Sequence, residues 1–597
     1  MPQPSPSPLT LRRYAFGQWR RFAVGAAALL ATNALGLVIP KQLKHAIDTL
    51  GHSGAEALPV IGRIALIIIG ASAMQAVVRT FSRIVIFNGG REIEYGLRRD
   101  LFTHIIALPQ EFHRRSPTGE LMSRLTNDLS AVRMLFGPGI LNVMNTTIVY
   151  ATGLYFMVGL SPRLTLFAII PLPLVVITAR FASRRIYRFS RELQAQMGKL
   201  SNHLQEDFNG ITTLRSYTLA PQRHARFKAL SDGYLDKSLE LVKTRGLLGP
   251  QFAIATGLGT LIVLWLGGRE VIAGRLTVGG LVAFNAYFVY LAWPTLALGW
   301  VLSLWQRGLA GWQRVRELLR EPATAQGDAL PVESATQAAL RVRDLSVVLG
   351  GRRILDKVSF LVPAGHTVAI VGRTGSGKST LTDALLRLVE VPPHTLFVND
   401  RDVTTLSLGA LRSMIAYAPQ DPFLFSATIA DNIAYGERWT GAGPPPAEGI
   451  HDESAMARIQ QAAIDAGLAR DLDELPQGLQ TMVGERGITL SGGQRQRVAL
   501  ARALYARTPL IILDDSLASV DAETEQTILR QLREHLGQRT AVLISHRVAA
   551  VQHANEILVL EQGHIAERGT HSALIAAKGI YAALYQEQEA ARLEAAE

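Results

Sequence analysis

The residues with the clearest chemical potential form one glycine-rich stretch in the second half of the chain. It reads Gly372-Arg373-Thr374-Gly375-Ser376-Gly377-Lys378-Ser379, is followed by Thr380, and fits the pattern G-x-x-x-x-G-K-[ST]. Glycines let consecutive backbone N–H groups point at one phosphate, beside the positive end of the following helix. Lys378 adds a charge for the outer phosphates, and the Ser379 hydroxyl is a ligand for Mg²⁺. We therefore predict that residues 372–380 bind a nucleoside triphosphate.

Three other places put polar side chains directly after apolar, strand-like segments. Gln420 is the first, and its amide could reach Mg²⁺ or an attacking water. Asp514 ends the second segment, where its carboxylate could hold Mg²⁺ through water, and Asp515 comes next. His546 follows the third, and its imidazole could hold a terminal phosphate. A buried strand acid or a core histidine would explain each residue alone, but their order and spacing favour one site.

A second glycine-containing stretch lies between Gln420 and Asp514. It reads Leu490-Ser491-Gly492-Gly493-Gln494 and opens a segment with helical spacing that runs to about Arg507. A serine and two glycines at a helix start offer free N–H groups to an anion. We predict that this stretch is a second phosphate-binding element.

The segments around these residues read as an α/β domain. Residues 367–371 are apolar and largely β-branched, as in a buried strand, and residues 380–388 have the apolar spacing of a helix. Strand, glycine-rich loop and helix in this order are the context that the phosphate-binding pattern requires. Other strand-like segments are residues 339–342, 358–361, 414–417, 510–514 and 541–544.

The first half of the chain has a different composition. The 597 residues include only 18% charged residues, the mean hydropathy is +0.17, and apolar residues concentrate before about residue 305. The net charge of +12 comes largely from Arg and Lys beside apolar segments, which indicates a membrane protein and not a nucleic-acid binder. The absence of cysteine excludes disulfides, thiolate catalysis and Cys-ligated metals.

Six apolar segments approach or exceed the roughly 20 residues that cross a bilayer. Two of the connections between them are long and rich in Arg and Lys, so the positive-inside rule places these and both chain ends in the cytoplasm. We expect the long connections to be helices that extend into the cytoplasm and turn near Pro109–Thr118 and Asp207–Leu214. The segments lie near residues 22–40, 57–78, 134–160, 164–181, 247–266 and 276–304.

Taken together, these motifs resemble the ATP-binding cassette (ABC) exporters of the half-transporter type, over nearly the whole chain. The match of Leu490–Gln494 to the cassette signature is specific to that superfamily and excludes GTPases and kinases that share only the phosphate loop. Further stretches similar to the family are residues 118–125, 481–487 and 565–571.

The resemblance implies an ATP hydrolase coupled to transport, using ATP and Mg²⁺, in the bacterial inner (plasma) membrane. Two chains would associate, with each ATP held by the phosphate loop of one cassette and the signature of the other. Ser379, Gln420 and Asp514 would hold the metal, and Asp515, His546 and Gln420 would act in hydrolysis. The substrate would be a hydrophobic or amphipathic drug, lipid or peptide, and nucleic acid is not an expected partner.

The sequence departs from the family at two positions. These exporters normally have glutamate as the general base where this chain has Asp515, and aspartate is one methylene shorter. An impaired own site beside an intact signature predicts one subunit of a heterodimeric exporter whose partner carries the glutamate. Leu349 stands where exporters usually place an aromatic residue that stacks on adenine, which leaves only weaker aliphatic contact with the base.

We therefore predict an all-α membrane domain of six transmembrane helices fused to an α/β P-loop ATPase domain. The expected boundaries are an N-terminal interfacial helix within residues 1–21, a transmembrane domain at 22–320, a linker at 321–337, a nucleotide-binding domain at 338–590 and a tail at 591–597. A homodimeric exporter or lipid flippase, and an ATP-gated channel or regulator, remain alternative functions. A soluble P-loop ATPase acting on DNA is disfavoured by the six apolar segments.

Overall fold

The computed structural model describes residues 10–53, 58–323, 337–437, 452–484, 490–516, 528, 530–531 and 539–594. The chain divides into two compact units. A helical unit comprises Met1–Ala107 and Ser116–Pro322, and a nucleotide unit comprises Leu108–Arg115 and Ala323–Glu597. Most of the predicted linker and the end of the predicted tail lie outside the described residues.

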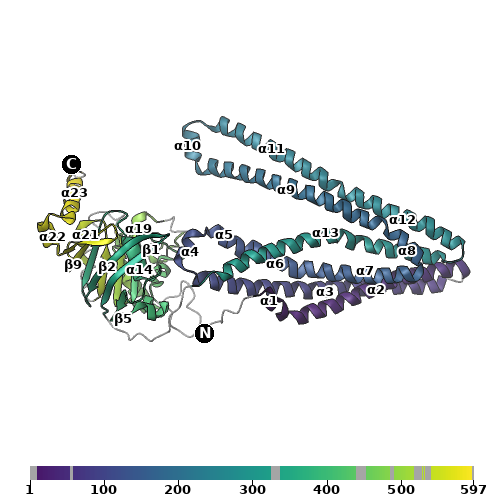
Figure 1. The fold of residues 1–597 in the computed structure, drawn as a ribbon, viewed down its shortest axis with the longest axis horizontal. Helices are drawn as coiled ribbons and strands as arrows, with labels where there is room; N and C mark the ends of the chain where they lie inside the picture. The colour runs from purple at the N-terminus through teal and green to yellow at the C-terminus, as the bar shows by residue number, and fades with distance from the viewer. Residues whose placement is uncertain are drawn as a thin grey trace. The chain divides into compact units, whose positions relative to one another are not determined.

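The described part of the helical unit is built from long helices (Figure 1). Its N-terminal part contains α1 (Leu11–Gly17), α2 (Trp19–Ser53) and α3 (Leu58–Ala107). The middle part contains α5 (Thr118–Ser123), α6 (Leu129–Met134), α7 (Ile140–Leu160), α8 (Pro162–Ile169) and α9 (Pro171–Asn209). The C-terminal part contains α10 (Ile211–Ser216), α11 (Ala220–Gly246), α12 (Leu248–Ile272) and α13 (Val278–Arg320).

Five of the described helical stretches are long and apolar enough to cross a membrane. The predicted span near residues 164–181 falls on α8 and the start of α9, which meet at Ile170. Pro171 is the first residue of α9, where its missing N–H costs no intrahelical bond. The fold class is as predicted: an all-helical membrane unit fused to an α/β unit.

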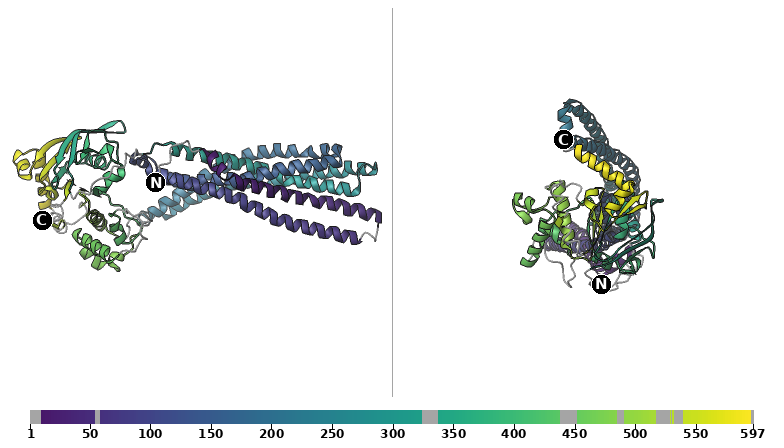
Figure 2. Two further views of the ribbon diagram at one scale, coloured as in Figure 1. Left: turned by 90° about the horizontal axis from the view of Figure 1, so that it is seen from below. Right: turned by 90° about the vertical axis from the view of Figure 1, so that its left-hand side faces the viewer.

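Close helix contacts in this unit depend on small residues. Figure 2 shows α2 and α3 side by side. A Cβ on Gly90 of α3 would lie 3.0 Å from the backbone nitrogen of Gly137, so glycine allows the two backbones to approach closely.

Asn33, which is buried, accepts a hydrogen bond of 2.8 Å from the Tyr290 hydroxyl and donates one of 3.2 Å to Asn145. These bonds join three helices across the apolar interior.

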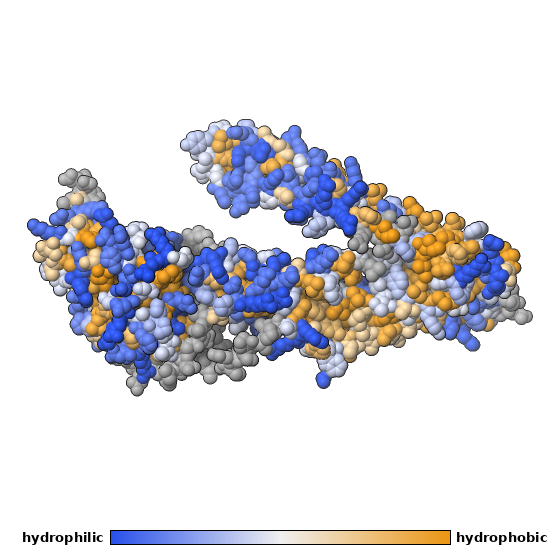
Figure 3. Space-filling view, viewed as in Figure 1, coloured by the Kyte–Doolittle hydropathy of each residue, from blue (hydrophilic) through white to orange (hydrophobic). Residues whose placement is uncertain are grey.

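The second long connection forms a helical hairpin at the predicted turning point. Helices α9 and α11 lie side by side and are joined through α10 (Figure 1). Arg223 of α11 donates to Asp207 of α9, and the imidazole of the buried His203 lies between the same helices, 3.2 Å from the Arg223 carbonyl oxygen. The surface around α10 is mostly hydrophilic, whereas apolar residues gather over the region of α8 and α12 (Figure 3).

The nucleotide unit contains two sheets. The antiparallel sheet has the order β2-β1-β4-β5, and the other has the order β10-β9-β3-β8-β7-β6. In the second sheet, β9, β3, β8, β7 and β6 are parallel to one another, and β10 pairs with β9 antiparallel. The strands of the first sheet are β1 (Leu340–Leu349), β2 (Arg352–Val362), β4 (Leu396–Val398) and β5 (Arg401–Asp402). Those of the second are β3 (Thr367–Val371), β6 (Ile415–Ala418), β7 (Leu510–Asp514), β8 (Thr540–Ile544), β9 (Glu556–Glu561) and β10 (His564–Gly569).

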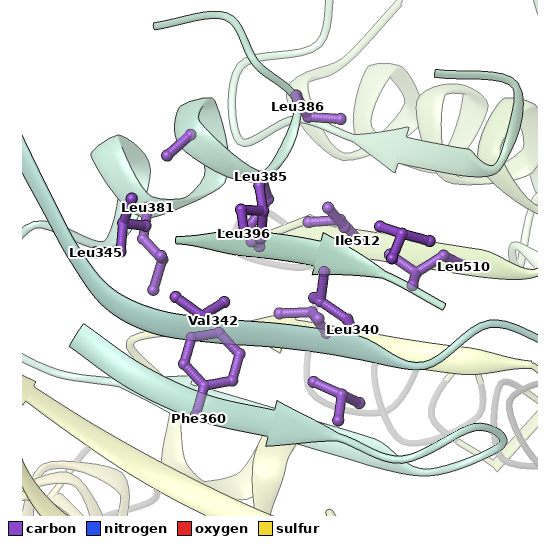
Figure 4. Close-up of a cluster of buried hydrophobic side chains, with 14 of the residues drawn as sticks. Leu340, Val342, Leu345, Phe360, Leu381, Leu385, Leu386, Leu396, Leu510 and Ile512 are labelled. Atoms are coloured by element: carbon purple, nitrogen blue, oxygen red, sulfur yellow. The ribbon is translucent and has the colours of Figure 1, made fainter. Parts of the chain in front are cut away.

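Helices complete this unit and close its core. Helix α14 (Lys378–Leu385) presents Leu381 and Leu385 to apolar residues of both sheets, among them Leu396 and Ile512 (Figure 4). The remaining α-helices with described bounds are α4 (Gln110–Arg115), α15 (Leu408–Ser413), α16 (Ile429–Ala434), α17 (Glu453–Asp465), α18 (Ala469–Glu474), α19 (Gly492–Tyr505), α21 (Val548–Val551), α22 (His571–Ala577) and α23 (Ile580–Glu594). The core thereby fixes α14, and with it the glycine-rich loop that precedes this helix.

Candidate nucleotide-binding and hydrolysis site

The sheet order brings the predicted site residues to one edge. The parallel strands β3, β8, β7 and β6 are neighbours in that order. The glycine-rich loop follows β3, Asp515 follows β7, His546 comes two residues after β8 and Gln420 comes two residues after β6. The carboxyl ends of parallel strands are where open α/β sheets bind ligands. Residues up to 174 positions apart in the sequence, from Gly372 to His546, therefore face one location.

The glycine-rich loop has a backbone that side chains would not tolerate. Gly375 has a φ of 84° and Gly377 a φ of 108°, both in the region that favours glycine. A Cβ on Gly372 would lie 2.3 Å from the carbonyl oxygen of Leu560 on β9. The glycines thus allow the loop to curl tightly against the sheet, as a phosphate-binding loop must.

Two side chains of the loop are suited to an anion. The Ser376 hydroxyl is buried and has no hydrogen-bond partner among the described residues. The Lys378 amine donates to the carbonyl oxygens of Gly372 at 2.7 Å and of Arg373 at 3.0 Å. Burial lowers the pKa of Lys378, while the charges of Asp515 and Asp514 oppose that change. An unsatisfied hydroxyl and a cation held inside the loop fit a bound phosphate group.

Asp514 lies at the end of β7 and is 5% exposed. Burial raises the pKa of Asp514 to about 6, and the charges of Asp515 and Asp383 act in the same direction. A hydrogen bond from the Thr382 hydroxyl and the charge of Lys378 oppose this rise. Burial and the neighbouring acids make this carboxylate costly to ionise. A bound cation nearby would offset that cost, so the surroundings of Asp514 suit a cation site.

Asp515 is held in a different way. Its φ of 47° is unusual for a residue other than glycine, and its N–H donates to the Ile544 carbonyl at 2.7 Å. Its carboxylate accepts from the Ser545 hydroxyl at 3.2 Å and the Gln420 amide at 3.4 Å, and lies 2.5 Å from Nδ1 of His546. The structure thus brings the three predicted hydrolytic residues, Asp515, His546 and Gln420, into one hydrogen-bonded group.

The stretch Leu490–Gln494 begins α19, as predicted. Ser491 caps this helix: its hydroxyl accepts from the Gln494 N–H at 3.2 Å, and its own N–H donates to the Gln494 side chain at 2.9 Å. Gln494 also donates to Asp471 at 3.1 Å, and Arg497 donates to the same carboxylate at 2.7 Å. Among the described residues, the structure shows no hydrogen bond between the signature at residues 490–494 and the phosphate loop of the same chain at residues 372–380.

Several residues near the site were not predicted from the sequence. Thr382 lies one helical turn after Lys378, and that spacing could have placed it near the strand ends. Asp471 belongs to no motif and is recognisable only from the fold. Arg114 of α4 donates to Asp383 of α14 at 2.7 Å. That ion pair lies within the nucleotide unit, which includes residues 108–115, although the sequence places these residues in the membrane half.

Two predicted features stand apart from this cluster. Leu349 ends β1 and packs partly buried against the core of the nucleotide unit, so its proposed contact with adenine stays a prediction. Part of the stretch at residues 481–487 lies outside the described residues.

Comparisons with known proteins agree with this geometry. The family model for the ABC transporter transmembrane region matches residues 22–295, and the model described as ABC transporter matches residues 355–518. The probable multidrug resistance ABC transporter ATP-binding/permease protein YheI of Bacillus subtilis (strain 168) is 34% identical over 96% of each chain. The multidrug resistance-like ATP-binding protein MdlA of Escherichia coli (strain K12) is 32% identical over 97% of this chain and 95% of that protein.

A third relative is the ATP-dependent lipid A-core flippase of Methylococcus capsulatus, which is 32% identical over 97% of this chain and 94% of its own length. The solved structure of a bacterial Atm1-family ABC exporter with ATP bound matches with a TM-score of 0.77 and 28% identity, over 95% of this chain and 99% of that chain. The match covers both the helical and the nucleotide unit. The chain belongs to the ABC transporters, as an ATP-hydrolysing exporter with its membrane and nucleotide-binding parts on one polypeptide.

Proposed function

We propose that this chain is one subunit of a heterodimeric exporter that moves a hydrophobic or amphipathic compound across the bacterial inner membrane. The heterodimer is inferred from Asp515, which stands where a glutamate base is expected. Its carboxylate forms hydrogen bonds with Ser545, His546 and Gln420. The relatives named for multidrug resistance and for lipid A-core flipping support an apolar or amphipathic substrate.

The geometry explains why Asp515 would be a poor general base. Both of its carboxylate oxygens already accept hydrogen bonds from groups of the same unit. A base must reach the proton that it removes within hydrogen-bond distance, and aspartate is one methylene shorter than glutamate. To act on another group, the Asp515 carboxylate would have to give up these hydrogen bonds. We infer that ATP bound at this chain's phosphate loop is hydrolysed slowly.

The other site residues have separate roles in this proposal. Residues 372–380 would bind the phosphates through backbone N–H groups and the Lys378 charge, and this binding does not require Asp515. Ser379, Gln420 and Asp514 would hold Mg²⁺, which when bound supplies positive charge to the phosphates. His546 would hold the terminal phosphate. The signature around Ser491 would complete the site formed on the partner's phosphate loop.

Transport would follow because ATP binds more tightly when the two cassettes are together than when they are apart. ATP contacts both cassettes only when they are together, so its binding favours that state by the difference in affinity. The bent connections at residues 108–115 and around α10 would transmit the closure to the helices, which would turn an inward-facing cavity outward. We place both termini in the cytoplasm and keep the domain boundaries given by the sequence.

The proposal is tested by co-purifying the tagged chain with the subunit that it assembles with, followed by ATPase assays of matched variants. Asp515→Asn should reduce turnover far less than replacing the partner's general-base glutamate by glutamine, which should remove most of it. ATP-dependent accumulation of a candidate amphipathic compound in inverted vesicles separates a pump from a channel.

Two results would contradict the proposal. A purified chain that assembles only with itself and retains full ATPase activity is a homodimer in which Asp515 suffices. If Asp515→Asn abolished turnover of a two-chain complex, the own site would not be impaired.

A further inference from the structure

The C-terminal helix α23 is anchored firmly at its first turn. The Glu567 carboxylate of β10 accepts from the backbone N–H groups of Ile580 at 2.5 Å and Tyr581 at 3.1 Å. Tyr581 is fully buried, and its hydroxyl lies 2.8 Å from Nδ1 of His571. A negative charge at a helix start is favourable in itself. The position of α23 on the nucleotide unit is therefore set by its first residues.

One face of α23 points toward the loop that carries His546. Tyr581, Leu584, Tyr585 and Gln588 follow the spacing of residues on one side of a helix. Leu584 and Tyr585 pack against the apolar cluster that contains Val548 of α21, and Figure 1 shows α21, α22 and α23 near one another at one end of the nucleotide unit. This packing carries Gln588, one turn later, to the backbone that follows β8.

Gln588 makes two hydrogen bonds to that backbone. Its Nε2 donates to the His546 carbonyl at 2.6 Å, and its Oε1 accepts from the Val548 N–H at 2.9 Å. A glutamine amide supplies one donor and one acceptor group, so a single side chain fixes the peptide units on both sides of Arg547. The Arg547 N–H in turn donates to the Ser545 hydroxyl at 3.0 Å. The loop is held at three consecutive points.

The loop held in this way presents the imidazole of His546. Its Nδ1 lies 2.5 Å from the Asp515 carboxylate, and the side chain is 51% exposed. An exposed imidazole has few packing contacts to orient it, so its direction depends on the backbone and on Asp515. We infer that Gln588 is a positioning residue of the nucleotide site, which holds residues 546–548 so that His546 faces the terminal phosphate. This inference rests on the proposed role of His546.

A second contact leads from the same turn of α23 to the phosphate loop. Glu587 lies 4.0 Å from Arg373, and both side chains are about three-quarters exposed, at 73% and 74%. An exposed pair of this kind contributes little by itself. It shows, however, that the turn containing Gln588 lies beside the phosphate loop as well as the His546 loop. The C-terminal helix thus contacts two of the segments that form the site.

The test compares Gln588→Met with Gln586→Met in the full-length chain, purified with whatever subunit it assembles with. Methionine has nearly the length of glutamine but forms neither bond, and Gln586 is exposed on the same helix. Photolabelling with 8-azido-ATP marks the chain that holds the nucleotide, and competition by ATP and by ADP then gives both affinities at this chain's site. We expect Gln588→Met to reduce the preference for ATP over ADP by about 3- to 10-fold. The ADP affinity should stay unchanged, as should both affinities in Gln586→Met.

His546→Ala and the double variant decide the mechanism. If Gln588 acts through His546, then His546→Ala loses the same preference and Gln588→Met adds no further loss in that background. An unchanged preference in Gln588→Met, a parallel loss of ATP and ADP affinity, or a double variant whose loss is the product of the two single losses would overturn the inference. If His546→Ala itself keeps the preference for ATP, the proposed role of His546 fails first.

Discussion

Replacing Asp514 by asparagine should stabilise the chain in the absence of metal and nucleotide. Burial raises the pKa of Asp514 from 3.8 to about 6, which corresponds to about 3 kcal/mol between the charged and neutral forms. Because the fold favours the protonated acid, the stabilisation is fully present below pH 3.8 and is lost as the pH rises through about 6. Near neutral pH the carboxylate is ionised at this cost, whereas asparagine carries no charge.

The expected gain is about 1 to 3 kcal/mol, since the asparagine amide needs a new hydrogen-bond partner. For a unit of this size, that gain raises the midpoint of thermal unfolding by about 2 to 10 °C. Differential scanning fluorimetry of the full-length protein measures it, with the transition of the nucleotide unit identified by its response to Mg·ATP. The difference between the two proteins should shrink as the pH falls below about 6.

Asp473→Asn is the matched control, because Asp473 is exposed on the surface of α18. It should change stability by no more than about 0.5 kcal/mol. Addition of Mg·ATP should reverse the order, since wild type gains stability from the bound cation and Asp514→Asn gains less. If Asp514→Asn unfolds at a lower temperature than wild type, or if the difference does not depend on pH, burial does not dominate the energetics of this carboxylate.

Three further changes test other parts of the site. Lys378→Ala should weaken ATP binding at this chain's site by about 10-fold or more, because a charge-assisted contact to phosphate is lost, as equilibrium binding to labelled nucleotide would show. Asp515→Glu should raise hydrolysis at this site by about 10-fold or more if reach limits the base; single-turnover assays that show no rise would contradict the role of side-chain length. Arg114→Ala should lower stability by about 1 kcal/mol in the wild-type chain and by much less in a chain that already carries Asp383→Asn. A double-mutant cycle measured by thermal unfolding tests this; additive losses would mean that the ion pair contributes nothing.

Local features of the site were predictable from the sequence. The apolar, β-branched run at residues 367–371 and the run ending in Asp514 match β3 and β7. The glycine-rich loop is formed by consecutive residues between a strand and a helix, so its local pattern was enough to predict it. The same holds for Ser491, because a helix cap is made within four residues.

The remaining parts depend on contacts between distant residues, which no local pattern contains. Arg114 and Asp383 are 269 positions apart and meet only because residues 108–115 join the nucleotide unit. Gln588 is 42 positions from His546, and in the sequence it resembles Gln586, the other glutamine of the same helix. The membrane half illustrates a different limit: hydropathy indicates the span near residues 164–181 but not that the chain divides it at Ile170.

The adjacent residues Asp514 and Asp515, at the end of β7, lie in different environments. Asp514 points to α14, where burial and the Thr382 hydroxyl act on it in opposite directions. Asp515 turns toward the loops after β6 and β8, and a backbone with positive φ places it there. Because these loops also carry Gln420 and His546, any change in their position alters what Asp515 can reach. We expect a longer acid at this position to reach beyond the Ser545 and His546 contacts. We therefore predict that the length of this side chain and the position of these loops together set the rate of hydrolysis at this site.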